Sequence, residues 1–320
     1  MNEPNLGKFT LQTGYFYHFF VLILRPEKII NDMKHNHAIA FLSIFIATFI
    51  GQTSKAGAVS YSDDLEKMTY SSRYFGPCAF PMPELHNGLI GDRYEIELRG
   101  EYQFYSGDKT TDMLLRVYLP FKKVAALEVS WLIYDHFKMT PETQAERYAV
   151  SATGKSWFQG DINVSAMFQV LKNPKIMDIL ISANIKTASG EDVANARFTD
   201  AATYWFDANL ARTIYTDEAR NFSVRVNVLG GFYCWMTNKI RLRQNDAYVY
   251  GAGATVTYRN FTFTTDYTSF HGYKNDGDHP AIWRNKLNYE IKKNIISVRY
   301  NHGMIDHLYD TVSLGYIRCF

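Results

Sequence analysis

Polar and apolar side chains alternate along most of the chain from position 94 to its last residue. Between Tyr94 and Phe104 every odd position is polar or charged, whereas the even positions are aromatic or aliphatic apart from Gly100. The stretches 161–168 and 222–228 repeat this arrangement. Since successive side chains of a strand point to opposite faces, a period of two predicts β-strands with one polar and one apolar face.

The connections between these stretches alternate between short and long. Short turns are predicted at 121–124, 172–175, 216–221, 259–261 and 292–295. Longer loops are predicted at 106–111, 136–157, 188–202, 238–246, 271–282 and 303–310. Membrane barrels have short periplasmic turns and longer external loops. We therefore predict an all-β, antiparallel, transmembrane up-and-down β-barrel over 94–320. Its twelve strands are expected near 94–105, 112–120, 125–135, 158–171, 176–187, 203–215, 222–237, 247–258, 262–270, 283–291, 296–302 and 311–320.

One further stretch, 147–153, also reads as a strand. We place it in the longest external loop as an extended hairpin. If it spans the membrane instead, a partner strand from 85–91 would make fourteen. The preceding segment, 59–93, contains three prolines, which disfavour regular strand pairing. We expect that segment to be irregular and to lie in the periplasm or enter the lumen.

The start of the chain has the features of an export signal. An apolar run of 13 residues, 38–50, is too short to cross a bilayer as a helix, which needs about 20. Lys34 precedes the run, and Ala56 and Ala58 follow it in an A-x-A cleavage pattern. This order predicts a signal peptide over 33–58. We expect 1–32 to be an untranslated upstream extension.

The chain ends on a strand whose outer face carries Val312, Leu314, Tyr316 and Phe320 at even positions. Together with the export signal and the twelve strands, this ending resembles the bacterial outer-membrane β-barrel superfamily. The resemblance implies residence in the outer membrane of a Gram-negative bacterium, in contact with its lipids. It also implies that Tyr316 and Phe320 form the signal read by the barrel assembly machinery. Arg318 departs from the pattern, because the family has an aromatic or aliphatic residue there.

A second likeness is confined to 186–190, Lys-Thr-Ala-Ser-Gly. It is similar to the Lys-x-Pro-Thr-Gly segment of transporter-like barrels linked to aromatic-compound (meta-pathway) operons. The proline is missing here, and we transfer no functional residue. The likeness implies passage of a small solute.

Composition narrows the class of protein further. The 23 Tyr and 22 Phe suit strands and interfacial aromatic girdles. Trp131, Trp205 and Trp235 are expected among the outward-facing anchors. A net charge of +2 argues against a nucleic-acid surface. The three cysteines form neither a disulfide framework nor a zinc pattern. We expect no metal, no cofactor and a monomer.

The candidate functional residues are the polar ones that strand parity directs inward. They include Glu95, Glu97, Arg99, Glu101, Arg116, Glu128, Asp161, Asp207, Arg225, Asp266, Lys286, Glu290 and Arg299. Both signs of charge are mixed, which leaves two hypotheses open. One is a narrow polar channel for a small solute. The other is an interior filled by Arg–carboxylate pairs, in a structural or surface-interaction barrel. Barrels of eight strands are filled by side chains, and those of sixteen strands hold water. A barrel of twelve strands lies between these sizes, so the strand number does not distinguish the two hypotheses.

A third hypothesis is a lipid-modifying enzyme of the outer membrane. Such barrels use a serine nucleophile that a histidine activates. No His-x-Ser pairing is present, and Ser297 and Ser313 lack an evident partner. The sequence therefore favours a barrel without catalytic residues, and the enzyme stays open.

Overall fold

The computed structural model describes residues 66–154, 158–240, 242–272 and 278–320. The predicted upstream extension and the signal peptide, with Ala56 and Ala58, lie outside these residues. Among the described helices, none has the length and apolar character to cross a membrane.

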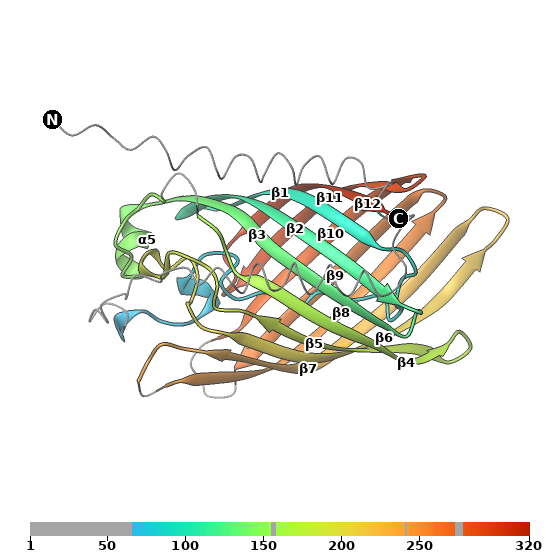
Figure 1. Ribbon diagram of the computed structural model, residues 1–320, viewed down its shortest axis with the longest axis horizontal. Helices are drawn as coiled ribbons and strands as arrows, with labels where there is room; N and C mark the ends of the chain where they lie inside the picture. The colour runs from blue at the N-terminus through green and yellow to red at the C-terminus, as the bar shows by residue number, and fades with distance from the viewer. Residues whose placement is uncertain (1–65, 155–157, 241, 273–277) are drawn as a thin grey trace, which may run out of the picture. The chain divides into compact units, whose positions relative to one another are not determined.

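Twelve antiparallel strands form a closed barrel, in which each strand pairs with its neighbours in sequence and β1 closes on β12 (Figure 1). This confirms the predicted fold and excludes the fourteen-stranded alternative. The strands are β1 (Glu95–Tyr105), β2 (Asp108–Phe121), β3 (Ala125–Met139), β4 (Ile162–Asn173), β5 (Met177–Lys186), β6 (Thr203–Asp217), β7 (Phe222–Met236), β8 (Gln244–Tyr258), β9 (Phe261–Gly272), β10 (Pro280–Ile291), β11 (Asn294–Ile305) and β12 (Asp310–Cys319).

The closing seam joins the first strand to the last. Glu95 lies opposite Cys319, and the pairing continues to Phe104 opposite Asp310. The backbone N–H of Phe320 donates to the carbonyl of Tyr94 over 3.0 Å. The final residue therefore lies beside the start of the first strand.

The two ends of the barrel differ in their connections. At one end, here called the turn end, tight turns place Lys122, Lys123, Arg259 and Lys292 at positive φ, between 51° and 58°. Turns of this hand match the twist of the strands that they join. The other end, here called the loop end, carries the long connections. The exception is 106–107, where the predicted loop is a two-residue connection.

The stretch 147–153 lies in the long connection between β3 and β4, but it is not an extended hairpin. The helix α5 (Pro141–Glu146) comes first, with the Thr140 side chain as its N-cap. Tyr148 then adopts a φ of 54°, which interrupts an extended run. Thr153 makes only an isolated bridge to Lys138.

Residues 66–93, here called the lumenal segment, lie inside the barrel and are drawn from blue to cyan in Figure 1. At the loop end, Phe75 and Phe80 pack edge to face, and Phe80 meets Trp235 in the same way. Near the turn end, Ile90 packs with Met167 and Leu180. The segment therefore runs through the lumen from the loop end to the start of β1.

The predicted outward orientation is wrong for two of the three tryptophans. Trp205 and Trp235 are buried in the aromatic cluster that encloses the lumenal segment. The indole N–H of Trp235 donates to the carbonyl of Tyr70 over 3.0 Å. Trp205 has the parity of the inward-facing Asp207, so strand periodicity itself places it inside.

Candidate functional site in the barrel lumen

A network of charged side chains lines the turn-end half of the lumen. Arg116 of β2 donates to Glu95, Glu97 and Glu128 over 2.7–2.9 Å. Arg99 of β1 donates to Glu101 over 2.7 Å. These residues come from adjacent strands at inward positions, so the strand pairing brings opposite charges together.

Glu97 is the centre of this network. Its carboxylate is fully buried and accepts from Arg99, Arg116 and Arg299 over 2.7–3.3 Å. Arg299 lies on β11, two strands away across the closing seam. The network therefore braces the seam, and each guanidinium is held by a carboxylate.

Access of water to the lumen decreases from the turn end inwards. The Arg93 and Glu290 side chains form an ion pair at the turn end, and each is 40% exposed. The side chain of Glu95 is 23% exposed, that of Arg99 is 10% exposed, and that of Asp108 is fully buried. Charged side chains are thus most exposed at the turn end and fully buried at the loop end.

Glu84 of the lumenal segment is more exposed than the wall side chains around it. Arg299 lies 3.4 Å from its carboxylate, and Arg99, Arg284 and Lys286 also act on its charge. Although cations from β1, β10 and β11 surround it, half of its side-chain surface is accessible to water. The interior of the barrel is therefore not filled at this level.

Buried charged residues close the loop end. Asp108 accepts from Arg147, Arg197 and Tyr309 over 2.6–3.1 Å. Arg197 also reaches Asp135 over 3.4 Å. All five side chains are almost fully buried, and we refer to them as the loop-end cap.

In the loop-end cap, the positive charges of two arginines balance the negative charges of two aspartates. Burial alone would lower the pKa of the Arg197 guanidinium, but Asp135 and Asp108 together raise it above its ordinary value. Burial raises the pKa of the Tyr309 hydroxyl, so this group stays protonated and donates to Asp108. Because each charge has partners, the cap holds the external loops together without a free ion.

The lumenal segment takes part in this closure. The N–H of Gly76 donates to the carbonyl of Ala196 over 2.8 Å. A Cβ at Gly76 would lie 2.8 Å from the guanidinium carbon of Arg197, so only glycine fits there without a shift. The cap and the segment are therefore packed as one unit.

Wall side chains hold the middle of the segment mainly by its carbonyl groups. Arg284 donates to Pro83 and Arg225 to Asn87, each over 2.7 Å. Gln169 donates to Gly88 over 2.7 Å and accepts from Ile90 over 2.9 Å. Pro81 and Pro83 have no N–H to offer a strand. The segment is thus held by side chains and not by a β-ladder.

The other predicted residues also have polar partners in the structure. Asp207 accepts from Ser182, Asp266 pairs with Arg284, and Arg225 pairs with Asp178. Asp161 precedes β4 and holds Lys186 over 2.7 Å at the loop end. The residues missed by sequence reasoning are Glu84, Asp108, Asp135, Arg147, Arg197, Arg284 and Tyr309.

The expected assembly-signal residues lie at the seam. Tyr316 is outward-facing and donates to Asn294 over 2.7 Å. The guanidinium of Arg318 lies 5.8 Å from the centre of the Phe320 ring and also donates to Asn294. Arg318 therefore covers the terminal ring at the turn end.

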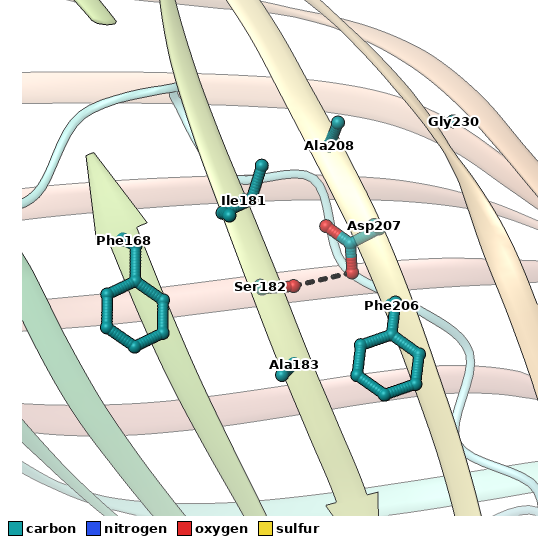
Figure 2. Close-up of a pocket in the computed structure, with 8 residues that line it drawn as sticks. All are labelled: Phe168, Ile181, Ser182, Ala183, Phe206, Asp207, Ala208 and Gly230. Carbon is teal, nitrogen blue, oxygen red and sulfur yellow. Dashed lines mark hydrogen bonds between the residues drawn. The ribbon is translucent and has the colours of Figure 1, made fainter. Parts of the chain in front are cut away.

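The outer wall carries a shallow apolar cavity of about 360 Å³ over β4–β7 (Figure 2). Its lining residues are Phe168, Ile181, Ser182, Ala183, Phe206, Asp207, Ala208 and Gly230. The dashed line in Figure 2 marks the hydrogen bond of 2.6 Å from the Ser182 hydroxyl to Asp207. Both polar groups are buried in the wall, so the cavity offers an apolar surface to its surroundings.

Two histidines have partners other than serine. The His279 ring lies 3.1 Å from the Tyr250 hydroxyl, and the His302 ring lies 2.7 Å from Asp310. Within the part of the chain that the structure describes, no group of three or more His, Cys, Asp or Glu side chains is arranged to hold a metal.

Comparison with known proteins supports the class of fold. No family model matches the chain, and no curated sequence matches it. The COG4313 outer membrane channel from Pseudomonas putida F1 is similar in structure, with 13% identity, a TM-score of 0.50, and coverage of 76% of this chain and 98% of that one. The KdgM porin matches with 13% identity, a TM-score of 0.45, and coverage of 71% and 99%. The NanC porin matches with 12% identity, a TM-score of 0.45, and coverage of 70% and 98%. The chain thus shares the β-barrel fold of the COG4313 outer membrane channel.

Proposed function

We propose that this protein resides in the outer membrane and lets a small solute cross when its lumenal segment moves from the position described here. In this arrangement the turn end faces the periplasm and the loop end faces outwards. The loop-end cap and the segment keep the passage closed in the present state.

One observation carries the proposal. The Glu84 side chain lies deep in the barrel among cations from three strands, yet half of its surface is accessible to water. A barrel that serves only as a scaffold has no need of a water-accessible carboxylate among cations at that depth. The fold shared with an outer membrane channel, which covers 98% of that chain, is consistent with passage.

The way in which the segment is held also favours movement. Its middle part is bound by individual side chains such as Gln169 and Arg225, whose hydrogen bonds can be exchanged for water. Such bonds contribute about 1 kcal/mol each, because water replaces them when they break. Displacement of the segment would therefore leave the barrel wall intact.

A structural barrel with a filled lumen is the second candidate. The aromatic cluster around Tyr233 and Trp235 and the buried cap around Arg197 favour it, because both exclude water from the loop-end half. Under this alternative, the lumenal segment is a permanent part of the core.

Conductance in planar lipid bilayers separates the two candidates. We expect brief, infrequent steps from the wild-type protein and several-fold more frequent steps from Gln169→Ala, which loses its contacts with Gly88 and Ile90. Gln244→Ala, an exposed position at the loop end, is the matched control. If neither the wild type nor Gln169→Ala opens under voltage, the filled barrel is correct. Co-sedimentation with outer membranes in a density gradient tests the location.

A further inference from the structure

The strand register brings two cations face to face in the lumen. Lys286 of β10 lies directly opposite Arg299 of β11. Like charges at paired positions destabilise a sheet unless a counter-charge lies nearby. In the wall, the nearest carboxylate to Arg299 is that of Glu97, which Arg99 and Arg116 also share.

Both cations have unused hydrogen-bonding capacity. Arg299 is more than nine-tenths buried, and its Nε atom has no hydrogen-bond partner among the described residues. Among the described residues, the Lys286 ammonium likewise forms no hydrogen bond or ion pair. The buried Nε of Arg299 costs free energy unless a ligand or water satisfies it, whereas Lys286 is partly exposed and its ammonium is open to a ligand.

The only carboxylate that the lumenal segment brings to this place is Glu84. It lies 3.4 Å from Arg299, a long distance for a charge-assisted bond, and it is half accessible to water. Arg284 adds a third cation, held on its other side by Asp266. When the segment moves, Glu84 leaves, and the cations of β10 and β11 face the hydrated lumen.

We propose that Arg284, Lys286 and Arg299 form a binding site for the carboxylate group of a small anionic solute, and that Glu84 occupies this site while the passage is closed. This rests on the proposed function, because the site is empty only when the segment moves. A solute carboxylate would compete with Glu84 and so favour the open state. Guanidinium and ammonium groups in a confined, partly dry lumen suit this chemistry.

Rescue of a truncated Glu84 by acetate tests the site in the full-length protein. Glu84→Ala removes the carboxylate and leaves space for acetate. Saturation-transfer NMR of the acetate methyl signal on detergent-solubilised protein should then show several-fold more transfer with Glu84→Ala than with the wild type. The double variant Glu84→Ala/Lys286→Gln should return the signal to the wild-type level, whereas Glu84→Ala/Lys293→Gln, altered at an exposed turn, should not. Glu84→Ser, which also removes the carboxylate and leaves most of the same space, serves if Glu84→Ala does not fold.

The two proposals fail in different ways. Equal acetate transfer to the wild type, Glu84→Ala and the Lys286 double variant would overturn the site, whether or not the barrel conducts. If acetate rescue is as expected but the barrel does not conduct, the proposed passage of a solute is overturned and the proposed carboxylate site stands. If both hold, acetate added to bilayers at constant ionic strength should raise the opening frequency of the wild type several-fold. Acetate should leave the opening frequency of Lys286→Gln unchanged. An equal response of the wild type and Lys286→Gln would also overturn the proposed site.

Discussion

Glu84 lies 3.4 Å from Arg299, although 215 residues separate them in the chain. The contact joins the lumenal segment to β11, at a level where water still reaches the carboxylate. The distance is long for a charge-assisted hydrogen bond, and water can replace Arg299 as the partner of the half-exposed carboxylate. The pair therefore holds the segment weakly, which suits a residue that must leave when the passage opens.

Glu97 should be the most sensitive carboxylate of the lumen. Glu97→Gln leaves Arg99, Arg116 and Arg299 close together with less counter-charge, and removal of one buried partner costs about 3–5 kcal/mol. We expect a markedly lower midpoint for heat-induced loss of the fast-migrating folded band in gels. Glu290→Gln, which breaks a half-exposed pair with Arg93, is the control and should shift the midpoint little.

Arg197 should be essential for closure of the loop end. Arg197→Gln leaves Asp108 and Asp135 buried with fewer partners, so we expect faster proteolysis of the β3–β4 and β5–β6 connections of the folded barrel. Arg220→Gln removes an ion pair at an exposed turn and should not alter the cleavage rate. Equal cleavage of the two variants would show that the cap does not restrain the loops.

Adjacent glycines of β7 should respond in opposite ways to alanine. A Cβ at Gly231 would overlap the backbone oxygen of Phe206, whereas a Cβ at Gly230 meets nothing within 4 Å. Gly231→Ala should therefore lower the yield of folded barrel in detergent refolding several-fold. Gly230→Ala only adds a methyl group at the outer cavity of Figure 2 and should fold like the wild type.

His307, between β11 and β12, should make the barrel sensitive to acid. Burial lowers its pKa to about 4, the positive charge of Arg284 adds to this, and Asp310 opposes it. In the unfolded chain the imidazole has its ordinary pKa of about 6.5. As the pH falls from 6.5 towards 4, the unfolded chain binds a proton that the folded chain does not, so stability decreases over this window by up to about 3 kcal/mol.

The matched variant for this prediction is His307→Gln. Urea midpoints measured between pH 7 and pH 4.5 should fall less steeply for the variant than for the wild type. Parallel pH profiles would mean that the pKa of His307 is the same in the folded and the unfolded chain.

The sequence predicted the barrel well, because each strand carries its own signal. The alternation in 94–104 places β1 within one residue of its observed start, and the tight turns at Lys122 and Lys292 mark the short connections. Parity also directs Glu97 and Arg299 to the same interior. Their contact follows only once the barrel has closed, since the two residues lie on opposite sides of the seam.

The parts of the site that are absent from the prediction have no periodic signal. The lumenal segment has three prolines and no alternation, so its path through the lumen depends on tertiary contacts such as that between Phe80 and Trp235. Arg147 and Arg197 lie in loops, where parity has no meaning, and only the folded chain brings them to Asp108. Trp205 could have been placed inside from the parity of Asp207.

Whether the lumenal segment must move for passage is the central question. Thr255 of β8 donates to the Asn87 side chain over 2.9 Å, so cysteines at both positions lie within reach of a short bis-methanethiosulfonate crosslinker, whose disulfide bonds are cleaved by reduction. The conductance of Asn87→Cys/Thr255→Cys in bilayers should be absent while the bridge is intact and should return on reduction, whereas each single variant should conduct with and without the reductant. Identical conductance steps from the verified crosslinked form and the reduced form would contradict the account.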